Sequence, residues 1–279
     1  MAANAFTVDV EDWFHICGID DRLPPSQWDA LDSRVVPTTR ALLDDLAATG
    51  NRATFLIVGW VAERFPALVR EIRDGGHEVG LHSYWHRRVF DLSPEAFRDD
   101  LRLNIAAVRA AGAGPLTTFR APEWSLNQHA PWALPILVEE GIRLDASRAP
   151  VARVGSPAFP RRPHPIATVA GALLELPPLV GRLAGQAVPL GWGWGLRKAE
   201  PGAVLDAIAA NNRKGDPAVL TVHPWEIDPA PPHVRLPPPL AFAHYYRLSG
   251  FRARLREVLA GAEFGPLCEL PDAEAWLRA

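Results

Sequence analysis

The chain has 279 residues, of which 48% are hydrophobic and 22% charged, and its formal net charge is -3. This composition excludes a disordered or fibrous chain, because enough apolar surface exists to offset the entropy lost on folding. With 29 Lys+Arg against 32 Asp+Glu, no basic excess is available to hold a phosphate backbone, so we expect no nucleic-acid partner. The two cysteines, Cys17 and Cys268, are too few for a disulfide framework.

The start of the chain shows no leader pattern. Residues 1–4 form no basic segment and no apolar core follows them. No stretch reaches the roughly 18 apolar residues of a membrane span. We therefore expect a cytoplasmic protein without a transmembrane segment.

Short apolar runs alternate with helical patterns along the chain. Apolar spacing, a Ser-Pro helix start at Ser93 and glycine stops mark the boundaries. In chain order the predicted elements are strand Ala5–Val10, helix Pro37–Thr49, strand Ala53–Val58, helix Trp60–Arg73, strand His77–Leu81, a helix from Ser93 to Ala111, strand Leu116–Phe119, helix Trp132–Glu140, strands Ile142–Asp145, Ala172–Leu176 and Ala218–Val222, and helix Phe242–Leu259.

This alternation predicts an α/β fold with a parallel sheet, because parallel strands need helical crossovers. Seven strands suit a barrel or a doubly wound sheet, and periodicity does not choose between them. The region Arg148–Gly195 is rich in Pro and Gly and is predicted as long loops over one face. We expect one domain, residues 1–279, with a C-terminal helical extension at about residues 229–279.

Polar residues follow the strands, where parallel α/β folds bind ligands. Alternation places Asp9 and Glu11 on one side of the first strand. Two such carboxylates repel, so at least one is expected to recruit a cation or a proton. A solvated acidic turn is the alternative.

The third strand leads into His82-Ser83-Tyr84-Trp85-His86. Histidines four apart on one helical turn can both reach one metal ion, and a carboxylate from elsewhere completes a site with open positions. Zinc, cobalt, nickel and iron all suit that ligand set. Taken alone, the pair is equally well explained as structural histidines.

Three further polar residues stand at the ends of predicted strands. Arg120 ends the fourth strand and can hold a carboxylate in a bidentate hydrogen bond. Asp145 ends the fifth. His223 follows the last strand, and an imidazole there can act as a general acid near neutral pH. Each has an ordinary structural explanation, but five such groups in this order are unexpected by chance.

The ordered motifs resemble the polysaccharide deacetylases of the NodB-homology type, carbohydrate esterase family four. They stand here as Thr7-Val8-Asp9-Val10-Glu11-Asp12, His82-Ser83-Tyr84-Trp85-His86, Arg120-Ala121-Pro122, Asp145-Ala146-Ser147 and Leu220-Thr221-Val222-His223. The stretch from Val8 to His15, His223-Pro224-Trp225-Glu226 and the tail around His244 are similar to an exosortase-associated exopolysaccharide subgroup. The resemblance implies a distorted (β/α) barrel, seven-stranded, as a single domain.

The resemblance also implies a role for each motif residue. Asp9 is expected as the general base, Arg120 as its orienting partner, His223 as the general acid and Asp145 as the residue that tunes His223. The expected metal ligands are His82, His86 and one carboxylate, either Glu11 or Asp12, of which alternation favours Glu11. Glu123 stands where many members have Tyr, and its backbone N–H is the expected oxyanion donor.

Taken together, the sequence predicts a metal-dependent hydrolase that removes N-acetyl groups from the amino sugars of a polysaccharide or its precursor. Zinc is the expected metal, with cobalt, nickel or iron as alternatives, and the expected partner is an N-acetylated glycan. Tryptophans near the motifs support a sugar ligand: Trp13, Trp85, Trp124, Trp192, Trp194 and Trp225. The alternatives are another amide hydrolase on the same fold and a degenerate glycan-binding member. A nucleotide-binding protein is disfavoured, since no Gly-x-Gly-x-x-Gly follows a strand. The oligomeric state is not predicted.

Overall fold

A computed structural model describes residues 4–152, 155–183 and 186–279. Its centre is an eight-stranded sheet in the order β10-β1-β2-β3-β4-β5-β7-β6. The strands are β1 (Ala5–Val10), β2 (Thr54–Ile57), β3 (Glu78–Leu81), β4 (Thr118–Phe119), β5 (Leu144–Asp145), β6 (His164–Thr168), β7 (Gly171–Glu175) and β10 (Val219–Val222). The seven strands predicted from the sequence are the parallel ones, and β6 adds to β7 antiparallel at the edge.

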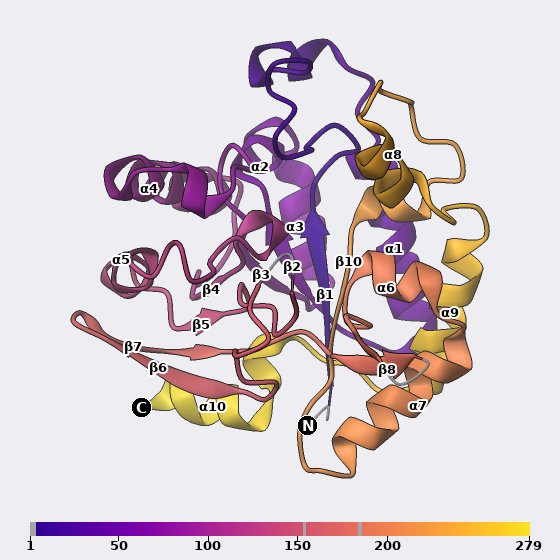
Figure 1. Ribbon diagram of the computed structural model, residues 1–279. Helices are drawn as coiled ribbons and strands as arrows, with labels where there is room; N and C mark the ends of the chain where they lie inside the picture. Colours follow the sequence, from indigo (N-terminus) through magenta and orange to yellow (C-terminus); the bar gives the residue numbers. More distant parts are fainter. Residues whose placement is uncertain (1–3, 153–154, 184–185) are drawn as a thin grey trace.

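The sheet curls into a half-barrel (Figure 1), which confirms the predicted α/β fold of the distorted-barrel type. In the order of the described strands β10 and β6 are the two edges, so the sheet stays open. Every residue of β1 and of β2 is buried. This is expected for parallel strands covered on both faces.

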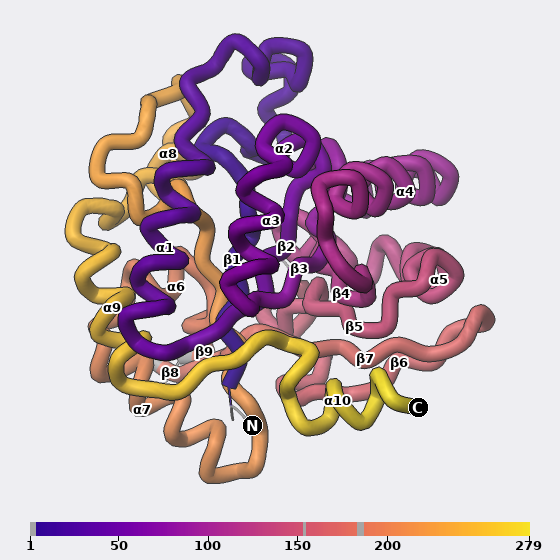
Figure 2. Tube along the Cα trace, turned by 180° about the vertical axis from the view of Figure 1, so that it is seen from behind, coloured from indigo at the N-terminus to yellow at the C-terminus, as the bar shows by residue number. Residues whose placement is uncertain are grey.

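Most of the helices cover the outside of the curl, as the view from behind shows (Figure 2). Those of the first half are α1 (Val35–Thr49), α2 (Gly59–Arg64), α3 (Pro66–Asp74), α4 (Pro94–Ala110) and α5 (Ala133–Glu139). Those of the second half are α6 (Gly193–Lys198), α7 (Pro201–Asn212), α8 (Pro238–Tyr245), α9 (Phe251–Gly261) and α10 (Pro271–Arg278). The apolar faces of α1 to α9 and most of the strands form one large core cluster, since each helix buries one stripe against the sheet.

Two helices predicted as continuous are each broken in two. The first, Trp60–Arg73, is interrupted at Phe65, whose φ of -127° and ψ of 57° are not helical. The cause is Pro66, which lacks an N–H and disfavours the helical conformation of the residue before it. The second, Phe242–Leu259, is broken between α8 and α9, where Arg247 and Gly250 have φ values of 51° and 72°.

The region Arg148–Gly195, predicted as loops, contains more regular structure than expected. Besides the β6–β7 hairpin it forms a two-stranded sheet of β8 (Gly181–Leu183) and β9 (Gln186–Val188), followed by the start of α6. Residues 153–154 and 184–185 of this region lie outside the described part. Helix α7 has no counterpart among the predicted elements. Hairpins depend on cross-strand pairing, which local periodicity does not reveal.

The end of the chain returns to its beginning. Gly265 forms a parallel bridge with Ala5, and its carbonyl accepts the N–H of Phe6 at 3.2 Å. Helix α10 packs under the β5–β7 end of the sheet, on a second core cluster that includes Leu144 and Leu174. Within the described ranges, no helix has the length and apolarity to cross a bilayer.

Candidate active site

The carboxyl ends of the parallel strands deliver polar side chains to one cavity of about 260 Å³. Asp9 lies in β1 and Glu11 directly after it, whereas His82 follows β3 and His223 follows β10. All of them line the cavity, as does His86. Sequence motifs far apart in the chain therefore meet at one place, as predicted for ligand sites at strand ends.

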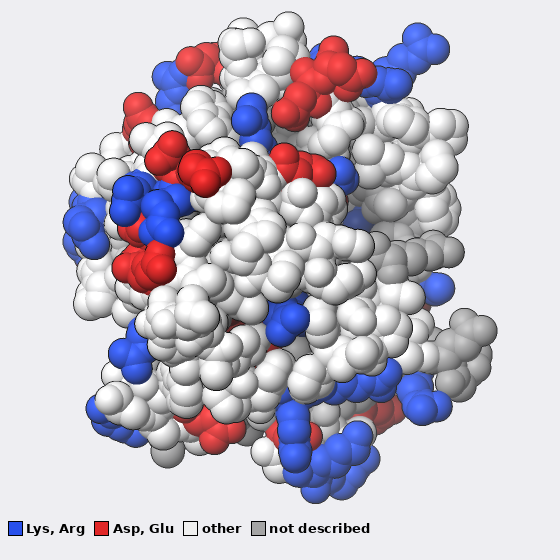
Figure 3. Space-filling view, turned by 60° about the vertical axis from the view of Figure 1, so that its left-hand side comes forward, with Lys and Arg blue, Asp and Glu red and all other residues white. Residues whose placement is uncertain are grey.

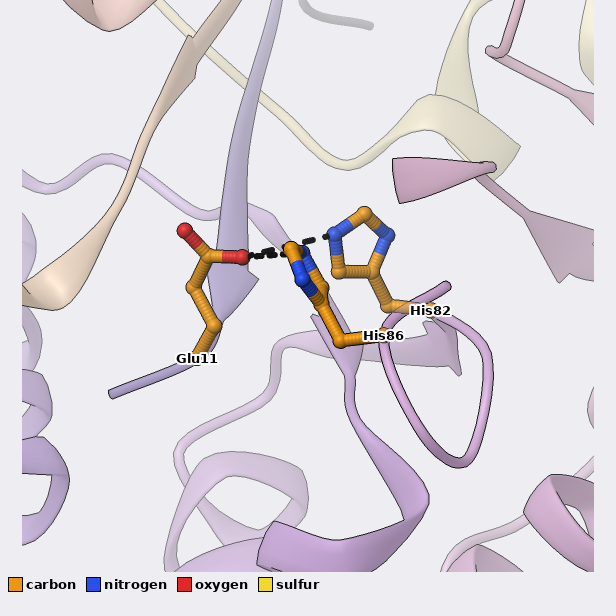
Figure 4. Close-up of side chains that lie close together, drawn as sticks. All are labelled: Glu11, His82 and His86. Carbon is orange, nitrogen blue, oxygen red and sulfur yellow. Dashed lines mark ion pairs between the residues drawn. The ribbon is translucent and has the colours of Figure 1, made fainter. Parts of the chain in front are cut away.

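Glu11, His82 and His86 form a compact cluster of buried ligand groups (Figure 4). One ligand atom from each lies within 4.8 Å of the other two. Nε2 of His82 is 3.8 Å from Oε2 of Glu11, and Nε2 of His86 contacts the same oxygen. Burial raises the pKa of Glu11, but the charges of His86 and His223 outweigh it and hold this pKa well below its usual range.

This cluster fits a divalent transition metal. Nδ1 of His82 lies 2.8 Å from the carbonyl oxygen of Arg120, so the ring proton is on Nδ1 and the lone pair of Nε2 is directed into the cluster. Oε2 of Glu11 is buried and faces Nε2 of both histidines. Two imidazole nitrogens and a carboxylate are a common donor set for zinc and its neighbours.

The two histidines do not share a helical turn, and that part of the prediction is wrong. The segment after β3 is a loop in which Ser83 and His86 have φ values of 63° and 52°. The left-handed residues fold the loop back, and the imidazole rings of His82 and His86 come within 5.1 Å of each other. Their convergence is a property of this loop.

Of the two carboxylates left open by the sequence, Glu11 belongs to the cluster and Asp12 does not. The carboxylate of Asp12 accepts from Ser33, from the N–H of Trp13 at 2.9 Å and from the N–H of Arg34 at 3.1 Å. Asp12 therefore holds the loop that leads into α1.

Glu11 is held from another part of the chain. The indole N–H of Trp225 donates to Oε1 of Glu11 at 2.9 Å and fixes the side chain of Glu11 in place.

Asp9 is held by Arg120 in a buried ion pair. Nη1 of Arg120 donates to Oδ1 of Asp9 at 2.7 Å, and both side chains are buried. Nε of Arg120 donates to the carbonyl of Ala146 at 2.9 Å, which anchors the guanidinium. Oδ2 of Asp9 faces Nε2 of His82 at 3.8 Å and Nε2 of His223 at 3.9 Å.

His223 pairs with Glu226, a residue that the sequence analysis did not single out for a role. Oε2 of Glu226 lies 2.9 Å from Nδ1 of His223 and accepts its backbone N–H at 3.0 Å. Arg197 is buried behind Glu226, with its Nε 2.8 Å from Oε1. Burial lowers the pKa of His223, but the carboxylates of Glu11 and Glu226 outweigh it and raise this pKa to about 9.

Asp145 does not contact His223, the partner that we expected for it. Its carboxylate accepts from Ser147, and it lies beside Glu175, its register partner on β7. No hydrogen bond or ion pair in the described ranges joins it to His223. The reason is topological, since four strands separate β5 from β10 in the sheet. The contact expected of Asp145 is made by Glu226, which the spacing His-x-x-Glu could have revealed.

The cavity wall beyond these groups comes largely from the second half of the chain. It includes Trp192, Trp194, Arg197, Trp225, Leu240, Ala243 and His244. Glu123 also lines the cavity, where Nε of Arg88 binds its carboxylate at 2.6 Å. Glu123 and Trp124 have φ values of 52° and 50°, a conformation that costs free energy and is concentrated at functional sites.

The chain is similar to known proteins in sequence and in fold. A polysaccharide deacetylase model matches residues 27–135, and a model described as a domain of unknown function (DUF3473) matches residues 146–271. The chain is 33% identical over 78 residues to the peptidoglycan-N-acetylglucosamine deacetylase of Bacillus cereus, a match that covers 28% of each protein. It is 29% identical over 96 residues to chitin deacetylase 1 of Saccharomyces cerevisiae, covering 34% of this chain and 31% of the yeast protein.

The fold has a counterpart over nearly its full length. The structure of a candidate polysaccharide deacetylase from Mycobacterium smegmatis superposes with a TM-score of 0.63, at 23% identity, over 98% of this chain and 89% of that one. The curated relatives, by contrast, are each matched over less than a third of their length. The family model and these relatives show that the chain carries a polysaccharide deacetylase domain of the NodB-homology type, and the shared fold agrees with this.

Proposed function

We propose that this protein is a metal-dependent N-deacetylase that hydrolyses the acetamide groups of amino sugars in a polysaccharide or its precursor. The observation that carries the proposal is one cavity in which the Glu11–His82–His86 cluster lies between Asp9, held by Arg120, and His223, held by Glu226. The finer assignments, zinc as the metal and an exopolysaccharide as the substrate, are part of the same proposal. So is the cytoplasmic location.

Each polar group has a distinct part in the proposed hydrolysis. A divalent cation on Glu11, His82 and His86 supplies Lewis acidity to the amide carbonyl and to the attacking water. Asp9 uses Oδ2 as the general base, because Oδ1 is occupied by Arg120. His223 presents Nε2 to the cavity, because Nδ1 is bonded to Glu226, and it carries a proton for the leaving amine.

The bonds made and broken balance. The water oxygen bonds to the acetyl carbon while Asp9 takes one water proton. The C–N bond then breaks, the amine nitrogen receives the proton of His223, and acetic acid and a free amino sugar leave. The acetic acid ionises to acetate, Asp9 releases its proton to solvent and His223 takes one up, which restores the site. The backbone N–H of Glu123 is the proposed oxyanion donor, and within the described residues it donates to no protein acceptor. Removal of one such donor costs about 3 kcal/mol of transition-state stabilisation.

The proposal is tested with protein loaded separately with zinc, cobalt, nickel or iron and incubated with N-acetylglucosamine oligomers. We expect acetate release that depends on the metal. Asp9→Asn and His223→Ala should lower kcat by about 10²-fold or more while metal content stays unchanged. His82→Ala should lose the metal itself.

Two results would contradict this assignment. The first is near-wild-type turnover of Asp9→Asn at saturating metal. The second is absence of acetate release by wild-type protein that still binds the oligomers. That second outcome favours a glycan-binding member, and a pseudoenzyme of the family from Bacillus anthracis has a similar fold, with a TM-score of 0.50.

Glu226 has the position of an orienting residue for His223. Glu226→Gln removes the negative charge beside Nδ1 and introduces an NH2 donor that can hold His223 in the wrong tautomer, so it should lower kcat by about 10²-fold and leave KM nearly unchanged. Glu226→Asp should restore part of the rate. Glu200→Gln is the matched control, because Glu200 binds Arg247 at the surface. Wild-type kcat in Glu226→Gln would show that His223 needs no such partner.

A further inference from the structure

The segment Gly191-Trp192-Gly193-Trp194-Gly195 places two indoles along the wall of the active-site cavity. Its glycines all pack closely against protein. A Cβ at Gly191 would overlap the backbone of Leu179 and Val219, one at Gly193 the carboxylate of Glu226, and one at Gly195 the backbone of Pro189. Trp192 and Trp194, which alternate with them, both line the cavity. The segment is therefore pressed against the protein at every glycine while its tryptophans line the cavity.

Both indoles have defined positions and remain partly exposed. The ring of Trp192 lies 4.4 Å from that of Trp124, at 35°. The ring of Trp194 has Nζ of Lys198 at 5.0 Å and the ring of Tyr246 at 6.3 Å. Rigid, partly exposed indoles of this kind offer apolar area to a ligand at a low cost in conformational entropy.

A polar group accompanies this apolar wall. His244 of α8 lines the same cavity, and its ring stacks on Trp225 at 4.1 Å and 17°. Its Nε2 is buried and has no hydrogen-bond partner. Leaving such an atom unpaired costs free energy, so a ligand hydroxyl that reaches it gains affinity.

The charges around the cavity define the class of ligand. Arg197 is the only Lys or Arg among the described residues that line the cavity. Its guanidinium is already bonded to Glu226 and to the carbonyls of Ala243 at 2.9 Å and His244 at 3.0 Å. The other charged lining residues are carboxylates or histidines. Apart from His223 and the proposed metal, no cation on the described lining residues is left to pair with a uronate or a phosphate, and Lys198 beside Trp194 is not a lining residue, so the wall suits an uncharged ring.

We infer that Trp192, Trp194 and His244 form a subsite that binds an uncharged pyranose ring of the glycan, with the C–H face of the ring on the indoles and one hydroxyl on Nε2 of His244. The inference rests on the proposed function for the position of the acetamide. It gives the segment matched by the domain of unknown function the task of recognising sugar.

The test measures binding in the Asp9→Asn background, where turnover does not interfere, by calorimetric titration with N-acetylglucosamine oligomers. Trp192→Ala and Trp194→Ala should each raise Kd about ten-fold. His244→Phe keeps the stacked ring and removes the nitrogen, and should raise Kd by about three- to ten-fold. The matched controls, Trp276→Ala in α10 and His233→Phe at the surface, should leave Kd unchanged.

A second measurement separates recognition from chemistry. With the native Asp9 present, the subsite variants should lose a larger fraction of kcat/KM on N-acetylglucosamine oligomers than on the sugar-free probe 4-nitrophenyl acetate. Equal impairment on this probe, or an unchanged Kd for the oligomers, overturns the subsite. If the variants weaken oligomer binding but wild-type protein releases no acetate, the proposed function fails and the subsite stands.

Discussion

Backbone groups fix the tautomers of three buried or half-buried histidines in this protein. Nδ1 of His82 faces the carbonyl of Arg120, which leaves Nε2 free as a ligand. Nδ1 of His15 accepts the N–H of Asp12 at 2.8 Å, so His15 carries its proton on Nε2. His77, far from the cavity, accepts the N–H of Ala53 through Nδ1 at 3.2 Å. A single residue type thus serves as ligand, donor and acceptor according to the backbone atom beside it.

His77 is expected to make stability depend on pH. Burial, aided by the charge of Arg52, lowers its pKa to about 4, whereas in the unfolded chain it titrates near about 6.5. Between these values the unfolded state binds more protons, so the stabilisation is complete above about pH 6.5 and is lost progressively as the pH falls toward 4. His77→Gln should lessen the drop in unfolding free energy between pH 7 and pH 5 by about 1 kcal/mol, after allowance for partial exposure.

Urea denaturation of both proteins at the two pH values gives this difference. The variant Arg73→Gln, which alters an exposed side chain on the neighbouring helix, is the control and should keep the wild-type pH dependence. An identical pH dependence in His77→Gln and wild type would contradict the prediction.

At the scale of elements, the second half of the chain positions His223, because Glu226 packs closely against the start of α6. The carbonyl of Gly191 accepts the N–H of Thr221 at 2.7 Å, which lays the segment before α6 along β10. The carboxylate of Glu226 then fits against Gly193, the first residue of α6. The orientation of His223 therefore depends on a helix that is distant in sequence.

Gly193→Ala should lower kcat by about 10-fold or more, because the added methyl group displaces the carboxylate that orients His223. Gly202→Ala is the matched control. A Cβ at Gly202, in the first turn of α7, meets nothing within 4 Å, so this variant should keep its activity and gain up to about 1 kcal/mol of stability. Steady-state kinetics and thermal melts measure both effects, and equal kcat values for the two variants would refute the role of Gly193.

At the scale of the whole molecule, the curl of the sheet brings distant strands together. Asp9 on β1 and Arg120 after β4 are separated by two strands in the sheet, yet they form a buried ion pair at 2.7 Å.

The charged residues at the surface lie in separate small groups. On the side shown in Figure 3, Lys, Arg, Asp and Glu gather in small groups, between which the surface is uncharged. The ion pairs of Arg98 with Glu139 and Glu140 join α4 to α5.

Helix α10 stabilises the molecule from outside the site. Deletion of residues 271–279 removes Ala273, Trp276 and Leu277 from the cluster around Leu144 and Leu174. We expect the unfolding free energy to fall by about 2–4 kcal/mol, with kcat at 25 °C unchanged, because no residue of α10 lines the cavity. Chemical denaturation and kinetics test this, with Glu274→Gln, which breaks an exposed ion pair, as the control. Loss of activity in the folded truncated protein would contradict it.

The positions of the parallel strands along the chain and the motif residues at their ends could be predicted from the sequence, because burial on both faces produces apolar runs and because ligand groups follow them. The seven parallel strands and the family were obtained in this way. The local path of the His82–His86 loop, the choice of Glu11 over Asp12, and the pairing of His223 with Glu226 instead of Asp145 were decided by tertiary structure. Each depends on which backbone atoms and side chains meet across the curled sheet, and such contacts between distant segments leave no periodic pattern in the chain.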